Sequence, residues 1–249
     1  MARRLHWKRE CAELVRLVDP GAAGKPLYFL AAGEVRGRFC LVPQVRGFTA
    51  WPISHELRAA IGVRWSGPGF CTVLCRKGPT GRRGLLGVAL HEYAHYVTEH
   101  GGALLAMLED SVMAPLLRYA PARRPGEVKV AGYTDETFDA DHGPRFYRIA
   151  AHVAYRSWRH WGGSLVELVG SLHWTLLAHP SAYAAALGDE PARRAGEPLA
   201  AIAASDPPPD FAEFARKDAA RVARHFARNE PQRRKPLPND SAPACLFTA

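Results

Sequence analysis

The sequence predicts an α+β fold in which a small β-sheet packs on one central amphipathic helix and the C-terminal half is helical. Short runs rich in β-branched and aromatic residues at 27–31, 38–45 and 70–76 have the length of strands. Residues 85–100 repeat apolar side chains at the spacing of a helix, and further helical runs follow from residue 143 onward. With 47% hydrophobic and 23% charged residues among 249, the chain has a globular composition.

The segments before the central helix carry start and stop signals of their own. Residues 4–18 are expected to form an amphipathic helix that ends at Pro20 and Gly21. Residues 53–61 are expected to form a short helix between the second and third strands. Pro43 lies inside the second strand run, which favours an edge position for that strand.

The central helix and its successors are defined by periodicity. Its apolar face recurs at offsets of four, three and four residues, and consists of Leu86, Leu90, Tyr93 and Val97. A later helix is expected from about Pro144 to Trp161, because proline is favoured in a first helical turn. Further helical runs are expected at 103–117, 163–178 and 181–187.

Residues 91–95 read His-Glu-Tyr-Ala-His, an H-E-x-x-H motif inside the central helix. Residues four apart lie on one helix face, so His91 and His95 are both able to reach one Zn²⁺ ion. Glu92 is rotated about 100° from His91, outside the ligand row but within reach of a metal-bound water. Zinc lowers the pKa of that water, and the carboxylate relays its proton to the leaving amine. The motif predicts zinc-dependent hydrolysis of peptide bonds, with Zn²⁺ as cofactor and Glu92 as general base.

A catalytic zinc site needs a third protein ligand besides an open position for water. Glu109 and Asp110 lie in the next helical run, where a carboxylate ligand is plausible. His142 stands just before a later helix, where it is able to project from the helix start while Phe146 packs inward. The residues alone leave His142, Glu109 and Asp110 as alternatives for the third ligand.

The motif at 91–95, followed by His-Gly-Pro-Arg-Phe at 142–146, resembles the SprT-like (Spartan-type) zinc metallopeptidases and the related WLM-type proteases. The resemblance covers about residues 70–160. It implies a zincin-like core, in which a small sheet packs on the H-E-x-x-H helix. It also implies that Glu92 is the general base and that the zinc ligands are His91, His95 and His142.

The expected substrate is a protein or a peptide, and the strand at 70–76 is a candidate for binding its backbone as an added strand. Two other functions fit the same residues. One is a DNA-binding or scaffold protein that keeps a metallopeptidase-like fold without proteolytic turnover. The other is a zinc hydrolase that acts on a bond other than a peptide bond.

The net charge of +9 makes nucleic acid a candidate second partner. Basic residues gather before the motif helix and again in residues 211–235, where Arg221, Arg224 and Arg228 share one helical face. Such a stripe is able to follow phosphates, and the alternative is a solvated helix face. Spartan-type proteases act on DNA-bound proteins, so the resemblance favours the same partner.

Composition divides the chain into four parts. Residues 1–188 form the expected metallopeptidase-like domain, and 189–210 read as a linker rich in proline and alanine. Residues 211–228 form a basic helix, and 229–249 contain four prolines and read as a disordered tail.

Membrane and secreted classes are not expected. The chain has no apolar run of about 18 residues, and its basic N-terminus lacks the apolar stretch of a secretory signal. An odd number of scattered cysteines argues for a reducing compartment, so the expected location is the cytoplasm. They are Cys11, Cys40, Cys71, Cys75 and Cys245.

Overall fold

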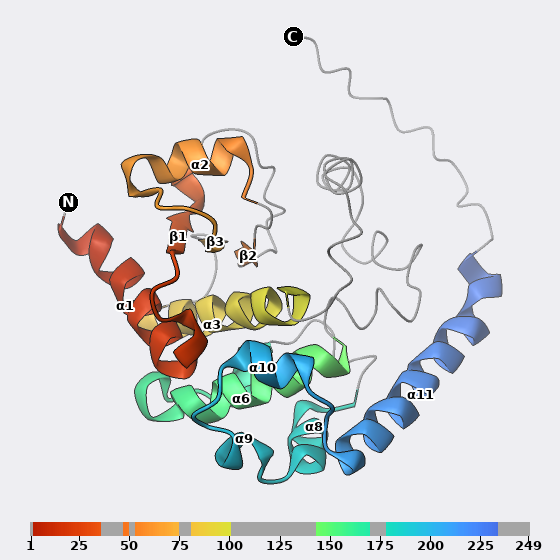
Figure 1. Ribbon diagram of the computed structural model, residues 1–249. Coiled ribbons are helices and arrows are strands. Elements are labelled where there is room, and N and C mark those ends of the chain that lie inside the picture. Colours follow the sequence, from red (N-terminus) through yellow and green to blue (C-terminus); the bar gives the residue numbers. More distant parts are fainter. Residues whose placement is uncertain are drawn as a thin grey trace, which may run out of the picture.

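The computed structural model describes residues 2–35, 47–49, 53–74, 81–100, 143–169 and 178–233. Over these ranges the chain is a mixed α+β protein with more helix than strand, as the sequence predicts (Figure 1). The strands are β1 (Leu27–Ala31), β2 (Gly47–Thr49) and β3 (Phe70–Leu74). The α-helices are α1 (Ala2–Val18), α2 (His55–Ile61), α3 (Gly81–His100), α6 (Pro144–Trp161), α7 (Leu165–Val169), α8 (Pro180–Leu187), α9 (Glu190–Arg193), α10 (Leu199–Ala204) and α11 (Pro209–Arg233).

The three strands form one sheet in the order β1-β3-β2. β1 runs parallel to β3, and β2 runs antiparallel along the other side of β3, with Thr49 opposite Thr72. The proposal that the strand at 70–76 adds a substrate strand is therefore wrong, because β3 is central and its neighbours occupy both sides. The expected strand at 38–45 and the expected helix at 103–117 lie outside the described residues.

The two faces of the sheet are covered by different helices, since successive side chains along a strand point to opposite faces. On one face Leu30 and Val73 pack with Leu57 of α2. On the other face Phe29 and Phe70 join a larger apolar cluster that includes α1 and α3. Both faces are thus buried, and β3 is buried along its whole length.

Helix α3 lies between the sheet and the C-terminal helices (Figure 1). It contacts β2 and β3 on one side and α1, α6, α7 and α10 on others. All four residues of its expected apolar face, Leu86, Leu90, Tyr93 and Val97, are buried. The helix that carries the H-E-x-x-H motif is therefore the centre of the fold.

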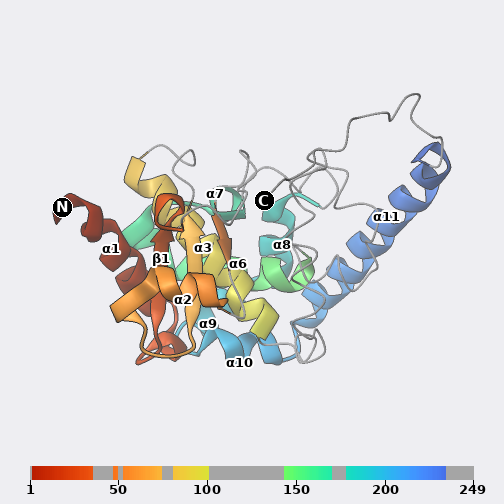
Figure 2. The same cartoon turned by 90° about the horizontal axis from the view of Figure 1, so that it is seen from above.

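The expected linker at 189–210 holds two short helices instead. Leu199 and Ile202 of α10 are fully buried and belong to the same apolar cluster as the residues of α1, α3 and α6. Phe211 and Val222 extend this cluster into α11, which then projects away from the other helices (Figures 1 and 2). Helix α11 also runs five residues beyond its expected end, to Arg233, and residues 234–249 lie outside the described ranges.

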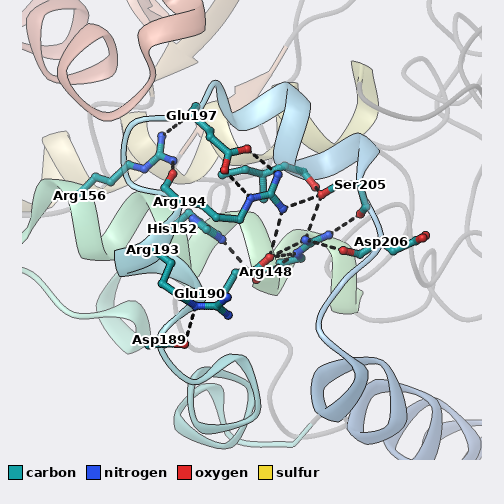
Figure 3. Close-up of polar contacts among 11 residues, drawn as sticks. Arg148, His152, Arg156, Asp189, Glu190, Arg193, Arg194, Glu197, Ser205 and Asp206 are labelled. Carbon is teal, nitrogen blue, oxygen red and sulfur yellow. Dashed lines mark hydrogen bonds and ion pairs between the residues drawn. The ribbon is translucent and has the colours of Figure 1, made fainter.

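A buried ion pair between Arg148 and Glu190 fastens α6 to α9 (Figure 3). The Arg148 Nη2 atom lies 2.6 Å from Glu190 Oε1, and the two side chains are only 5% and 3% exposed. Arg148 also donates to the main-chain carbonyls of Ser205 and Asp206. The guanidinium of Arg156, two turns later, donates to the carbonyls of Val18, Arg194 and Glu197. These bonds explain why a segment with the composition of a linker is fixed on the core.

His152 is fully buried beside this ion pair, with its Nε2 atom 3.5 Å from Glu190 Oε2. The other ring nitrogen, Nδ1, has no hydrogen-bond partner within the described ranges. Burial lowers the pKa of His152 to about 4, and this effect outweighs the opposing attraction of Glu190. His152 is therefore neutral at pH 7 and belongs to the core.

Asp19 joins three segments at the C-terminal end of α1. One carboxylate oxygen accepts from the backbone N–H groups of Gly21 and Leu199, at 2.9 and 3.0 Å. The other accepts from the Tyr93 hydroxyl of α3 at 2.5 Å. This buried carboxylate thus links α1, α3 and α10, and it is compensated by three donors.

Candidate metal centre

The side chains of His91 and His95 meet on one face of α3. Their Nε2 atoms lie 3.2 Å apart, and the ring centroids are 4.8 Å apart. Two ligands held about 2.0–2.1 Å from a tetrahedral ion are separated by about 3.3–3.4 Å. The two nitrogens are within hydrogen-bond distance of each other, and their separation is also close to that of two imidazole ligands of one Zn²⁺ ion.

The ring of His91 is held in one tautomer by α7. Its Nδ1 atom lies 2.8 Å from the main-chain carbonyl oxygen of Leu168. A carbonyl oxygen only accepts, so Nδ1 carries the proton and donates, which leaves the Nε2 lone pair for a metal in the neutral ring. A bond of this kind from the second ring nitrogen is the usual support of a metal-ligating histidine.

Helix α7 is tied to the start of α3, which fixes the carbonyl of Leu168 over His91. Arg83 of α3 forms an ion pair with Glu167 at 2.6 Å. Trp161, at the end of α6, donates from its indole N–H to the carbonyl of Arg83 at 2.7 Å. The His91 support is thus built from a helix that lies 77 positions later in the chain.

Phe146 of α6 covers both imidazoles. Its ring centroid lies 5.0 Å from that of His91 and 4.4 Å from that of His95. Because Phe146 lies in the first turn of α6, the start of this helix is brought next to the histidine pair. Gly143 is the N-cap of α6, and the residue before it is His142.

The structure does not describe the residues that the sequence offers as a third ligand. His142, Glu109 and Asp110 are all outside the described ranges. Inside those ranges, no group of three or more His, Cys, Asp or Glu side chains is placed to hold a metal ion. The histidine pair fits two ligand positions of a zinc site, and the third position stays a prediction.

Glu92 follows His91 in α3 and is only 6% exposed. The hydroxyl of Thr49, on β2, lies 2.9 Å from Glu92 Oε2 and 2.8 Å from the carbonyl oxygen of Glu92. Sequence reasoning missed Thr49, because no motif connects residues that are 43 positions apart. It also missed the carbonyl of Leu168, since a backbone atom leaves no signal in a sequence.

Four of the basic residues that the sequence offers as a nucleic-acid surface form ion pairs. Before the motif helix, Arg82 forms an ion pair with Glu10, and Arg83 with Glu167. In α11, Lys217 pairs with Glu213 and Arg221 pairs with Asp218. The positive charge of these residues is therefore partly compensated, and contact with nucleic acid stays a prediction.

No helix in the described part of the chain combines the length and the apolar character needed to cross a membrane. Comparison of the chain with protein-family models, with curated proteins and with solved structures finds no match.

Proposed function

We propose that this protein is a zinc-dependent peptidase whose ion is held by His91 and His95 and whose general base is Glu92. The observation that carries the proposal is the Nε2–Nε2 distance of 3.2 Å, combined with the bond from His91 Nδ1 to the carbonyl of Leu168.

His142 is the proposed third ligand. The start of α6 lies beside the histidine pair because Phe146 packs on both rings. His142 precedes this helix start directly, whereas Glu109 and Asp110 have no such anchor in the described part of the chain. The proposal that the chain is a Spartan-type relative depends on this residue as well as on the H-E-x-x-H motif.

A zinc ion in this position supplies Lewis acidity, which lowers the pKa of water and polarises a carbonyl group. The protein supplies the remaining chemistry. The carboxylate of Glu92 accepts a proton from the attacking water and later donates it to the amine of the departing peptide. The bond from His91 to the carbonyl of Leu168 and the packing of Phe146 hold the His91 ring in one orientation while the proton is transferred.

The substrate backbone is proposed to add to β2 rather than to β3. Among the described strands, β2 pairs with β3 only, and no other described strand lies along its second edge. The same strand contacts Glu92 through Thr49, which brings the proposed base next to that edge. An extended peptide bound there gains main-chain hydrogen bonds without dependence on one side-chain sequence.

The experiment compares zinc-loaded wild-type protein with Glu92→Gln on a library of peptides made by tryptic digestion of a bacterial proteome. Mass spectrometry of new peptide termini reports cleavage. Wild-type protein is expected to cleave, and Glu92→Gln is expected to bind zinc equally and to lose about 10²- to 10⁴-fold in rate.

Two results contradict the proposal. Wild-type protein that binds zinc but cleaves no peptide in the library has no general peptidase activity. Equal cleavage by wild type and Glu92→Gln shows that the activity comes from another site. A salt-dependent shift of duplex DNA that survives Glu92→Gln, in a protein without peptide cleavage, favours the DNA-binding scaffold.

A further inference from the structure

Thr49 makes a two-point contact with the residue proposed as the general base. Its hydroxyl lies 2.8 Å from the main-chain oxygen of Glu92 and 2.9 Å from the carboxylate oxygen Oε2. One hydroxyl is thus within hydrogen-bond distance of both the backbone and the side chain of the same residue. The contact defines where one carboxylate oxygen lies relative to the α3 backbone.

The close approach of β2 to α3, which makes this contact possible, depends on the absence of a Cβ atom at Gly47. A Cβ atom at Gly47 would lie 2.8 Å from Val88 Cγ1 and 3.3 Å from Glu92 Cγ. Val88 and Glu92 are one turn apart on α3, so glycine lets the strand lie directly on the helix face that bears Glu92. The antiparallel pairing with β3, in which Thr49 lies opposite Thr72, fixes the register of Thr49 along this face.

A glutamate side chain needs such a constraint. Its terminal torsion is broad, so a carboxylate without a fixed partner samples many orientations. A general base is effective only within hydrogen-bond reach of the proton that it accepts. A donor on a strand of the sheet supplies an orientation that the helix itself does not impose.

We propose that Thr49 is a positioning residue that holds the carboxylate of Glu92 in the orientation needed for proton transfer. The inference rests on the proposed function, because it assigns Thr49 a role in the same reaction. Thr49 acts through Glu92 and binds neither metal nor substrate through its hydroxyl.

The competing interpretation is that the hydroxyl merely fastens β2 to α3. A fastening role would affect stability, zinc affinity and substrate affinity together. A positioning role would lower kcat and leave KM and zinc affinity nearly unchanged, because the interaction matters only when the proton moves.

The test uses full-length, zinc-loaded protein and three variants. Thr49→Val removes the hydroxyl with little change in shape, and Thr49→Ser keeps it. Thr98→Val is the matched control, because among the described residues the Thr98 hydroxyl bonds to carbonyls of its own helix, those of Ala94 and His95. Thr49→Ala replaces Thr49→Val if the valine variant does not fold.

Zinc affinity is measured by chelator competition, and kcat and KM are measured on a library peptide that the wild type cleaves. Crystal structures give the position of the Glu92 carboxylate. We expect Thr49→Val to lower kcat by about 10- to 100-fold, the usual effect of losing an outer-shell partner. Thr49→Ser and Thr98→Val should retain kcat within about threefold, and zinc affinity should change less than about twofold in all three. The Glu92 carboxylate should move in Thr49→Val only.

The proposal is overturned if Thr49→Val keeps the wild-type kcat, if Thr49→Ser loses as much as Thr49→Val, or if the Glu92 carboxylate stays in place without the hydroxyl. If the wild type cleaves nothing, the proposed function fails by itself. The crystal structures then still decide whether Thr49 orients Glu92.

Discussion

The ring of Phe146 lies against the imidazole of His95, with 4.4 Å between centroids and 31° between the ring planes. Phe146 is in the first turn of α6, so this contact fixes where α6 begins relative to the motif helix. The chain enters α6 from His142 through Gly143, which is buried as the N-cap. Phe146, in the first turn of α6, thereby contacts two residues in the middle of α3, His91 and His95.

This relationship leads to the first prediction, that His142 is the third zinc ligand. His142→Ala should reduce zinc affinity by more than the 10- to 100-fold that an outer-shell partner usually contributes. Glu109→Ala and Asp110→Ala should change it less than about threefold. Chelator competition measures all three, and a silent His142→Ala with a large loss in either carboxylate variant would reverse the assignment.

The second prediction concerns the histidine pair itself. His91→Ala and His95→Ala should each abolish stoichiometric zinc, because each removes one of two nitrogens that lie at ligand spacing. Glu92→Gln is the matched control, since it lies between them on the same helix and should retain one zinc per chain. Elemental analysis of purified protein gives the result, and full zinc retention in both histidine variants would exclude the site.

The third prediction tests the close approach of β2 to α3. Gly47→Ala should lower the free energy of unfolding by about 1–3 kcal/mol, the usual cost of overpacking. The added methyl group would lie 2.8 Å from Val88 Cγ1 and 3.0 Å from Leu74 Cδ2. Gly33→Ala is the control, because nothing lies within 4 Å of a Cβ at that position. Urea unfolding measures the free energy of unfolding of both variants. Equal values would show that β2 moves to make room for the methyl group without loss of stability.

The fourth prediction concerns the segment that resembles a linker. Leu199→Ala and Ile202→Ala should each cost about 2–5 kcal/mol, because both side chains are fully buried. Ala200→Ser, on the exposed side of α10, should change stability by less than about 0.5 kcal/mol. If thermal unfolding finds all three variants alike, α10 contributes nothing to the core.

The fifth prediction is a dependence of stability on pH that comes from His152. Its pKa is about 4 in the folded protein, because burial disfavours the charged ring, and about 6.5 in an unfolded chain. Between these values the unfolded chain binds more protons than the native protein, so stability falls as the pH is lowered from about 6.5 to 4. The full loss is about 3 kcal/mol, and it is complete below the folded pKa.

Replacing His152 by leucine removes this contribution. Urea unfolding at several pH values between 4 and 7 should therefore give a smaller pH slope for His152→Leu than for the wild type. Glu190, Arg148 and Arg156 face His152 in the folded protein and remain in both. Because His152 also helps to lower the pKa of Glu190, the slopes are compared above about pH 5, where that carboxylate is ionised with or without the imidazole. Parallel slopes would show that His152 does not titrate differently in the two states.

The sequence predicts the elements whose signal is local. The apolar periodicity of α3 and the proline at the start of α6 identify both helices, and β1 is found with its observed bounds. These patterns depend on neighbours within a few residues, so no tertiary information is needed. His91 and His95 lie on the same face of α3 because they are four residues apart on a helix, which is also a local relationship.

The elements that the sequence does not predict depend on distant contacts. β2 has three residues and becomes a strand because it pairs with β3. α9 and α10 have four and six residues, less than two full turns, so neither shows a periodicity, and they are stabilised by burial against the core. The partners of Glu92 and His91, which are Thr49 and the carbonyl of Leu168, lie 43 and 77 positions away.

The carboxylate of Asp19 accepts a hydrogen bond from Leu199, which is 180 positions later in the chain. During synthesis α1 and α3 are completed long before the ribosome has made α10. Until then this carboxylate lacks one of its donors, and the apolar cluster that Leu199 and Ile202 complete stays open to solvent. Domains with such distant contacts acquire their final packing late. The histidine pair of the nascent chain is therefore held on a helix whose packing is completed only after α10 has been made.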